Sequence, residues 1–350
     1  MQDRRPVPAA AAPTGLVACL GEALALVDPV TGVDAGGAPV PRRAALAGAE
    51  ANVAVALAAA GVPVQWVGRL GADGLGSHLA AELGRRGVRL DGVEIDPSLP
   101  TGWYSKIVRR VAGGEPQTEM RYRRAGSAAA AMEPAFLDRT DTAAVLAQAA
   151  VVHTSGITAA LSPACAAMMR ALLMGPRRGG LVSFDVNWRE QLWPDGDPAE
   201  VVALAGAADV VMVGADEARR VFGTDDPAEL RALLPSPQLL VIKDGHVQAR
   251  GVDRNGSVVD VPALSVEVVE AVGAGDAFAA GLLFGVMVGE PVEQALRRGH
   301  LSAARVLTVH SDSAPPFPAG VLNAMLTCTE QEWAQTRISA AGVRSPAVSN

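Results

Sequence analysis

The sequence predicts an α/β fold: a doubly wound, mostly parallel sheet with helices on both faces, plus a small separate β-sheet. Short apolar runs rich in β-branched residues alternate with helical segments along most of the chain, which implies right-handed crossovers between parallel strands. Around residues 101–124 the alternation gives way to two strands flanking a Gly-Gly turn, which favours a hairpin. The 350 residues are 49% hydrophobic and 19% charged, so the chain can bury a large core.

The first third of the chain supplies the start of the main sheet and all of the small one. Its first helix is Ala-rich, carries its apolar side chains on one stripe and meets Gly61 at the stop position. The predicted elements, in order, are strands at 14–20 and 24–30, a helix at 49–60, a strand at 64–67, a helix at 75–86, and hairpin strands at 101–111 and 119–124 around Gly113-Gly114.

From Pro134 onward the alternation of strands and helices returns. The predicted strands are 151–153, 181–185, 210–213, 239–243 and 266–269, and the predicted helices are 143–148, 163–173, 199–205, 216–222 and a long apolar helix that opens at 273.

These elements predict one domain over residues 14–328, with a β appendage made from about 22–47 and 98–126. The Pro/Ala-rich residues 1–13 are expected to form a disordered leader, and the polar residues 329–350 a flexible tail.

Composition excludes several classes of protein. Thirty basic and 37 acidic residues give a net charge of −7 without a basic run, which argues against a nucleic-acid partner. Three widely spaced cysteines fit neither a disulfide framework nor a zinc site. The N-terminus lacks the apolar core of a secretory signal, so we expect a cytoplasmic protein. Residues 271–289 are nearly all apolar, but Asp276 and the opening glycines disfavour a membrane span.

A short glycine-rich segment, Gly273-Ala274-Gly275-Asp276, opens the long apolar helix. Glycines let a backbone approach an anion closely, and the free amides and dipole of a helix start attract it. A carboxylate there would repel a phosphate unless it takes a proton from an attacking hydroxyl. On spacing alone, Asp276 is as well explained as a cap of its own helix as it is as a catalytic base.

The same segment resembles the C-terminal signature of the PfkB (ribokinase-like) carbohydrate kinases, which residues 269–278 (VEAVGAGDAF) match. Residues 47–54 and 67–76 are similar to the N-terminal signature, so the resemblance covers nearly all of 16–308. It implies a ribokinase-like fold with a β-sheet lid, a sugar substrate, ATP with Mg²⁺, and a homodimer formed through the lid. It also implies that Asp276 is the general base, beside an anion hole of Gly273, Ala274 and Gly275.

Within that family, four segments are similar to 2-keto-3-deoxygluconate kinases: Gly21-Glu22, residues 122–128, 153–162 and 183–193. The implied reaction transfers phosphate to the terminal hydroxyl of 2-keto-3-deoxygluconate. A carboxylate on the sugar calls for charge-assisted, fork-shaped donors, which arginines supply. The residues expected to contact the sugar are Gly48, Ala49, Glu50, Asn52, Tyr104, Tyr122, Arg124, Arg189, Asp276 and Asp312.

The resemblance also implies a nucleotide side, made by Asn187, Arg189, Lys243, Gly245, Gly273, Gly275 and His300. Glu217 would face the metal through water, although Gly214 replaces the Asn of the family's Asn-x-x-Glu motif. Structural explanations remain open for three residues. Glu50 could complement its helix dipole, Lys243 could be a solvated strand end, and His300 could be a buried structural group.

Other activities remain open. The sugar could be a neutral ketose such as fructose, or 5-keto-2-deoxygluconate, and a relative that binds sugar without catalysis is a further alternative. A nicotinamide dehydrogenase is disfavoured, because the first strand leads to Gly21-Glu22 and not to a Gly-rich pyrophosphate turn.

Overall fold

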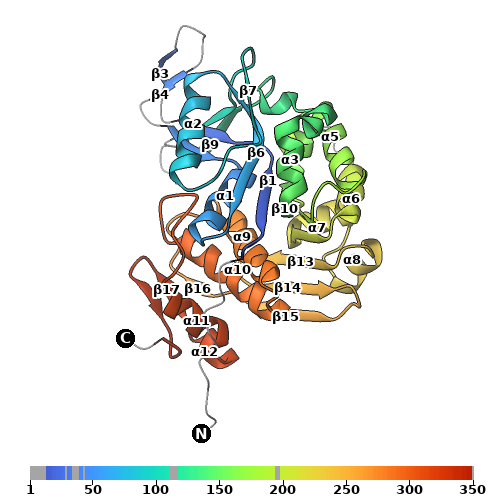
Figure 1. The fold of residues 1–350 in the computed structure, drawn as a ribbon. Coiled ribbons are helices and arrows are strands. Elements are labelled where there is room, and N and C mark those ends of the chain that lie inside the picture. The colour runs from blue at the N-terminus through green and yellow to red at the C-terminus, as the bar shows by residue number, and fades with distance from the viewer. Residues whose placement is uncertain are drawn as a thin grey trace.

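The computed structural model describes residues 13–27, 30–33, 39–41, 44–109, 117–193 and 198–348. A nine-stranded sheet runs through the middle of the molecule (Figure 1). Its strands, in spatial order, are β15 (Val258–Pro262), β14 (Gln248–Asp253), β13 (Leu239–Asp244), β12 (Val210–Gly214), β11 (Leu181–Asp185), β10 (Ala149–Ser155), β1 (Leu16–Leu20), β6 (Val64–Gly71) and β7 (Val93–Asp96).

Seven of these strands, from β13 to β7, run parallel, and only β14 and β15 are antiparallel. The predicted doubly wound, mostly parallel sheet is therefore confirmed. β1 lies between β6 and β10, so the chain winds away from β1 first in one direction and then in the other. Ligands of such sheets bind in the crevice at the carboxyl ends of the strands beside this switch point.

Helices cover both faces of the sheet because neighbouring residues along each strand point to opposite sides: Cys19 joins one buried cluster and Leu20 the other. One face packs against α1 (Ala49–Ala59), α2 (Gly74–Arg85), α9 (Ala274–Met287), α10 (Val292–Leu307) and α11 (Ala319–Thr327). The other packs against α3 (Thr140–Gln148), α5 (Pro163–Leu173), α6 (Pro198–Ala207), α7 (Ala215–Phe222) and α8 (Pro227–Leu233). Shorter helical turns lie between these elements: α4 (Gly156–Ala160), η1 (Ala129–Ala131), η2 (Pro134–Asp138) and η3 (Glu190–Leu192).

A separate four-stranded sheet, called the lid here, has the order β5-β2-β8-β9 and confirms the predicted small sheet. The predicted hairpin is its β8–β9 pair, although the Gly113-Gly114 turn lies outside the described residues. The strand predicted at 24–30 is shorter and ends at Val27. The lid strands are β2 (Leu24–Val27), β5 (Ala44–Ala47), β8 (Trp103–Arg109) and β9 (Gln117–Arg123), with the pair β3 (Val30–Val33) and β4 (Pro39–Pro41) nearby in sequence.

Two expectations near the C-terminus are wrong. Residues 266–269 are not a strand of the main sheet: β16 is only Ser265–Val266 and pairs with β17 (Arg337–Ser339). Nor do residues 329–348 form a flexible tail, because α12 (Glu330–Ala334), β17 and β18 (Gly342–Arg344) fold onto the domain below α10 (Figure 1). Two widely spaced apolar side chains, Trp333 and Ile338, are each 2% exposed and anchor this segment.

The leader predicted at residues 1–13 falls almost entirely outside the described residues. Among the helices that are described, none has both the length and the apolar character needed to cross a membrane.

Candidate active site

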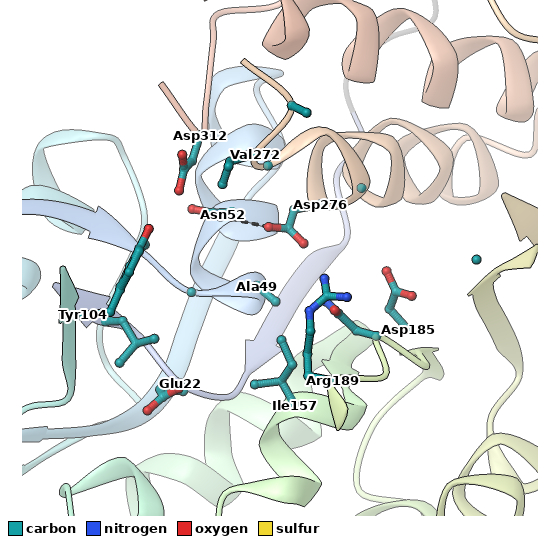
Figure 2. Close-up of a pocket in the computed structure, with 18 of the residues that line it drawn as sticks. Glu22, Ala49, Asn52, Tyr104, Ile157, Asp185, Arg189, Val272, Asp276 and Asp312 are labelled. Atoms are coloured by element: carbon teal, nitrogen blue, oxygen red, sulfur yellow. Dashed lines mark hydrogen bonds between the residues drawn. The ribbon is translucent and has the colours of Figure 1, made fainter. Parts of the chain in front are cut away.

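A cavity of about 370 Å³ opens at the carboxyl ends of β1, β11, β12 and β13, between these strand ends and the lid. Figure 2 shows Tyr104 and Asp312 on one side of it, Asp185 on the other, and Asp276 between them. A second cavity of about 340 Å³ adjoins it, because Lys243, Ala271 and Gly275 line both. The site therefore has two adjoining chambers. In the first, the part near the lid is called the lid end, and the part near the start of α9 the helix end.

The helix end is built from backbone. The first intrahelical donor of α9 is the N–H of Ala277, bonded to the carbonyl of Gly273 at 2.9 Å, so within the described part of the chain the amides before it are left for a ligand. Gly273 has φ +82°, and a Cβ there would lie 2.5 Å from the backbone oxygen of Asp312. Only glycine fits this position. The free amides and the helix dipole make an anion-binding cradle.

Asp276 stands in the first turn of α9 and faces the cavity. Its carboxylate accepts a hydrogen bond from the side-chain amide of Asn52 at 2.8 Å and does not cap its own helix (Figure 2). Burial raises the pKa of Asp276 to about 7; the Asn52 hydrogen bond lowers this pKa, and the nearby Asp185 charge raises it further. A carboxylate with such a pKa can accept a proton near neutral pH.

Lys243 is not the solvated strand end that the sequence leaves open. Its ammonium bonds both carboxylate oxygens of Asp185, at 3.0 and 2.8 Å, and joins the ends of β13 and β11. Burial alone lowers the pKa of Lys243, but Asp185 and Glu217 raise it above its usual value. The amine therefore stays charged beside both chambers.

Glu217 accepts a hydrogen bond from the N–H of Gly214 at 2.9 Å and lies 3.4 Å from Nη1 of Arg189. Burial, followed by the Asp185 charge, raises the pKa of Glu217. The described residues contain no group of three His, Cys, Asp or Glu side chains arranged around one metal. The carboxylate of Glu217 alone does not fit a metal held entirely by protein ligands. It does fit Mg²⁺ carried by phosphates and water, because such an ion needs only one or two protein carboxylates.

The lid end is built from side chains. Tyr104 and Tyr122 stack with ring centroids 5.2 Å apart, and the guanidinium of Arg124 lies 4.5 Å from the centroid of Tyr122. Arg124 also contacts Glu22: its Nε lies 3.5 Å from Oε2 of Glu22, a carboxylate only 1% exposed. An aromatic stack with a buried ion pair can hold a flat, polar ligand.

Most predicted site residues come together. Those lining the first chamber are Gly48, Ala49, Asn52, Tyr104, Tyr122, Arg124, Asn187, Arg189, Glu217, Lys243, Gly273, Gly275, Asp276 and Asp312. Those lining the second are Lys243, Gly245, Ala274, Gly275 and His300.

Glu50 lines neither chamber, so the structure does not support its predicted contact with the sugar. It is fully buried, and its Oε1 accepts hydrogen bonds from the hydroxyls of Ser155 and Thr158 at 2.7 and 2.8 Å. Burial raises the pKa of this carboxyl. The helix that carries Glu50 turns it beneath the cavity floor, while Asn52 reaches the cavity itself.

Two of the predicted nucleotide-side residues have unusual surroundings. His300 lines the second chamber and also has a structural bond, because its Nε2 lies 3.0 Å from the carbonyl of Val261 and its ring packs edge-on against Phe278. Burial lowers the pKa of His300 to about 4, so the ring is neutral. Asn187 has φ +38°, and its buried Oδ1 has no hydrogen-bond partner among the described residues.

Sequence reasoning missed three carboxylates of the first chamber: Asp216, in the first turn of α7, and the pair Glu22 and Asp185. Both stand at the carboxyl end of a buried parallel strand, Glu22 just after β1 and Asp185 as the last residue of β11. A charged residue at the end of an apolar strand was the available signal, because that edge of a parallel sheet binds ligands.

Comparison with known proteins decides the family. The sequence profile of the pfkB family carbohydrate kinases matches residues 15–319. The chain belongs to this family. The resemblance found in the sequence is thus confirmed, and the protein is an ATP-dependent sugar kinase of PfkB type with a ribokinase-like fold.

Relatives in this PfkB family differ in the sugar they are named for. The chain is 32% identical over 281 residues to a 2-dehydro-3-deoxygalactonokinase of Haloferax volcanii, covering 78% of this chain and 85% of that one. It is 33% identical over 282 residues to the 2-dehydro-3-deoxygluconokinase of Thermoproteus tenax (78% and 83%). It is also 34% identical over 274 residues to Fructokinase-1 of Oryza sativa (77% and 82%).

A solved PfkB structure agrees with the fold. A fructokinase of Xylella fastidiosa with bound ATP superposes with a TM-score of 0.71 at 25% identity, covering 85% of this chain and 93% of that one. The relatives therefore agree on the kinase but divide between sugar acids and ketoses.

Proposed function

We propose that this PfkB kinase phosphorylates a keto-deoxy sugar acid, with 2-keto-3-deoxygluconate as the first candidate and its terminal hydroxyl as the acceptor. The observation that carries the proposal is the pair of guanidinium groups, Arg124 and Arg189, that line one chamber together with Asp276. An acid needs such donors and a neutral sugar does not. The similarity to kinases named for 2-dehydro-3-deoxy sugar acids supports it.

Asp276 is the general base of this proposal. Its carboxylate takes the proton of the sugar hydroxyl as that oxygen forms a bond to the γ-phosphorus of ATP and the bond to the β-phosphate oxygen breaks, releasing ADP. Asn52 holds the carboxylate in place through its hydrogen bond. The free amides at the start of α9 stabilise the charge on the transferred group.

The second chamber is proposed to hold the adenine side of ATP. Apolar side chains such as Leu264 and Phe278 line it beside His300, which suits a flat heterocycle. Gly275 and Lys243, at the junction, would meet the phosphates. Mg²⁺, when bound, neutralises phosphate charge, and Glu217 would hold its water shell.

A neutral ketose is the second candidate substrate. The fructokinase relative is as similar to this chain as the sugar-acid kinases are. The carboxylates of Glu22 and Asp312, which line the lid end, could accept hydrogen bonds from ketose hydroxyls.

Steady-state phosphorylation of a sugar panel tests these proposals. The panel contains 2-keto-3-deoxygluconate, its galactose-derived epimer, 5-keto-2-deoxygluconate and fructose, and we expect the highest kcat/KM for one of the first two. Arg189→Ala should lose turnover of the acid. Arg170→Ala should not, because Arg170 lines neither chamber and pairs with Glu200. Preference for fructose would overturn the substrate, and saturable binding without phosphorylation of any sugar would indicate a non-catalytic relative.

We also propose that the lid forms a homodimer. β9 is an edge strand of the lid, and its Met120 and Tyr122 side chains are 37% and 50% exposed. Edge strands with exposed apolar side chains are commonly covered by another chain. Light scattering at working concentration tests this, and a monomer would contradict it.

A further inference from the structure

The lid end contains a buried carboxylate that the proposed reaction does not use. Glu22 follows β1, lies in the floor of the first chamber and is 1% exposed. Neither of its oxygens has a hydrogen-bond partner among the described residues. Its nearest cation is Arg124, with Oε2 and Nε 3.5 Å apart, which is close enough for charge attraction but too long for a good hydrogen bond.

Arg124 is held from two sides. Its side chain is 13% exposed, its guanidinium lies over the Tyr122 ring, and Glu22 approaches Nε. The same guanidinium lines the chamber that holds the sugar. A bound sugar acid would therefore bring a second carboxylate to a cation that already faces one.

We propose that Glu22 is a positioning residue for Arg124 that takes up a proton when a sugar acid binds, leaving the guanidinium charge to the substrate carboxylate. This inference rests on the proposed function, because only an anionic substrate competes with Glu22 for Arg124. No covalent step is involved, and the proton comes from solvent.

The electrostatics of the pocket favour this exchange. Among the described residues, the charged and titratable groups that face Glu22 are Arg124 from the end of β9, Glu50 from α1 and Cys165 from α5. Burial raises the pKa of Glu22 to about 7; Arg124 lowers this pKa, and Glu50 raises it. A substrate carboxylate adds a further negative charge in a poorly solvated site, which raises the pKa again.

The direction of the pH dependence follows. Because binding of the acid raises the pKa of Glu22, the protonated form binds the acid more tightly. Affinity should be highest below the free-state pKa and should weaken above it by at most about tenfold per pH unit. A neutral ketose adds no charge, so its affinity should not change through Glu22.

Isothermal titration calorimetry without ATP tests the proposal. 2-Keto-3-deoxygluconate and fructose are titrated from about pH 6 to about pH 8.5 in buffers of different ionisation enthalpy, which reports the protons taken up. Wild type should take up a proton with the acid near neutral pH and lose affinity several-fold to about tenfold at the alkaline end. In Glu22→Gln both effects should disappear. Glu133→Gln, an exposed carboxyl outside both chambers, should behave as wild type.

Three outcomes separate the possibilities. Proton uptake that persists in Glu22→Gln would assign it to another carboxyl of the chamber, such as Asp276, Asp312 or Glu217, and would overturn the role of Glu22. Acid binding without any proton uptake in wild type would do the same while leaving the proposed substrate intact. Fructose binding with no acid binding would overturn the proposed substrate and this inference together. Should Glu22→Gln not fold, the same titrations on Asp276→Asn, Asp312→Asn and Glu217→Gln decide: proton uptake that persists in all three supports the role of Glu22, and its loss in any one of them would overturn it.

Discussion

The two ends of the first chamber present different chemical groups to a ligand. The helix end offers backbone amides at the start of α9, fixed by a glycine that no other residue can replace. The lid end offers side chains, with Tyr104, Tyr122 and Arg124 carried on or beside β8 and β9. Most substitutions leave backbone amides unchanged, so the helix end suits the phosphate chemistry that our proposal assigns to it. Side chains can change without disturbing the fold, so under the same proposal the lid end is where relatives named for different sugars are expected to differ.

The largest effect should come from the one side chain on which the helix end depends. Asp276→Asn keeps the shape and the contact with Asn52 but cannot accept a proton, so kcat should fall by about 100-fold to 10,000-fold. Sugar and nucleotide affinities, measured by calorimetry, should change little. Turnover close to wild type would show that the helix end does not depend on this base.

The lid end should control affinity for the acid and not the chemical step. Arg124→Gln removes a charge-assisted donor, so KM for the sugar acid should rise by about 10-fold to 100-fold. KM for fructose should change far less, and kcat at saturation should be largely retained. Equal losses for the acid and the ketose would contradict a division of labour between the two ends.

Substitution of Gly273 tests whether its close contact with Asp312 matters beyond the strain of a left-handed backbone. Gly273→Ala should destabilise the fold by more than the matched Gly289→Ala, which has a similar φ (+72°) but open space around a Cβ. Left-handed backbone alone costs about 1–2 kcal/mol, and the contact with Asp312 adds to that at 273. Denaturant unfolding measures both variants. Only Gly273→Ala should also lower kcat; equal stability losses would show that the close contact is unimportant.

Near neutral pH the smallest effect is the pH dependence of turnover at the helix end, because much of the Asp276 carboxyl is already ionised there. Because burial raises the pKa of Asp276 to about 7 and only the ionised form accepts a proton, kcat should rise with pH, by about tenfold per unit below the pKa, and level off above it. Both substrates are kept saturating, so that changes of affinity at the lid end do not contribute. The residual activity of Asp276→Asn should lack this rise.

The sequence predicts best where signals are local. The helix at 49–60, the lid hairpin and the glycine-rich start of α9 follow from turn residues, periodicity and capping, and all three are confirmed. The C-terminal segment fails that kind of reasoning. Trp333 and Ile338 are isolated among polar residues, and their burial depends on a surface formed by residues about 70 positions earlier, such as Pro262, whose carbonyl accepts the Trp333 indole N–H.

The same limit applies inside the site. Glu50 and Asn52 stand two residues apart on α1, yet one lies beneath the floor and the other reaches Asp276. Which of them meets the ligand depends on the rotation of the helix against β1 and β10, which no local pattern encodes. Glu22 was overlooked for a related reason: its partner Arg124 is about a hundred residues away, and strand pairing in the lid brings the two together.

Gly275 borders both chambers, and a Cβ placed on it would meet no atom within 4 Å. In the proposed reaction, the boundary between the two chambers therefore carries no side chain at the point where the phosphoryl group would pass from ATP to the sugar. A large side chain introduced at position 275 would occupy this boundary and leave the residues of both chambers unchanged. Such a variant should still bind sugar and ATP but should not transfer phosphate between them.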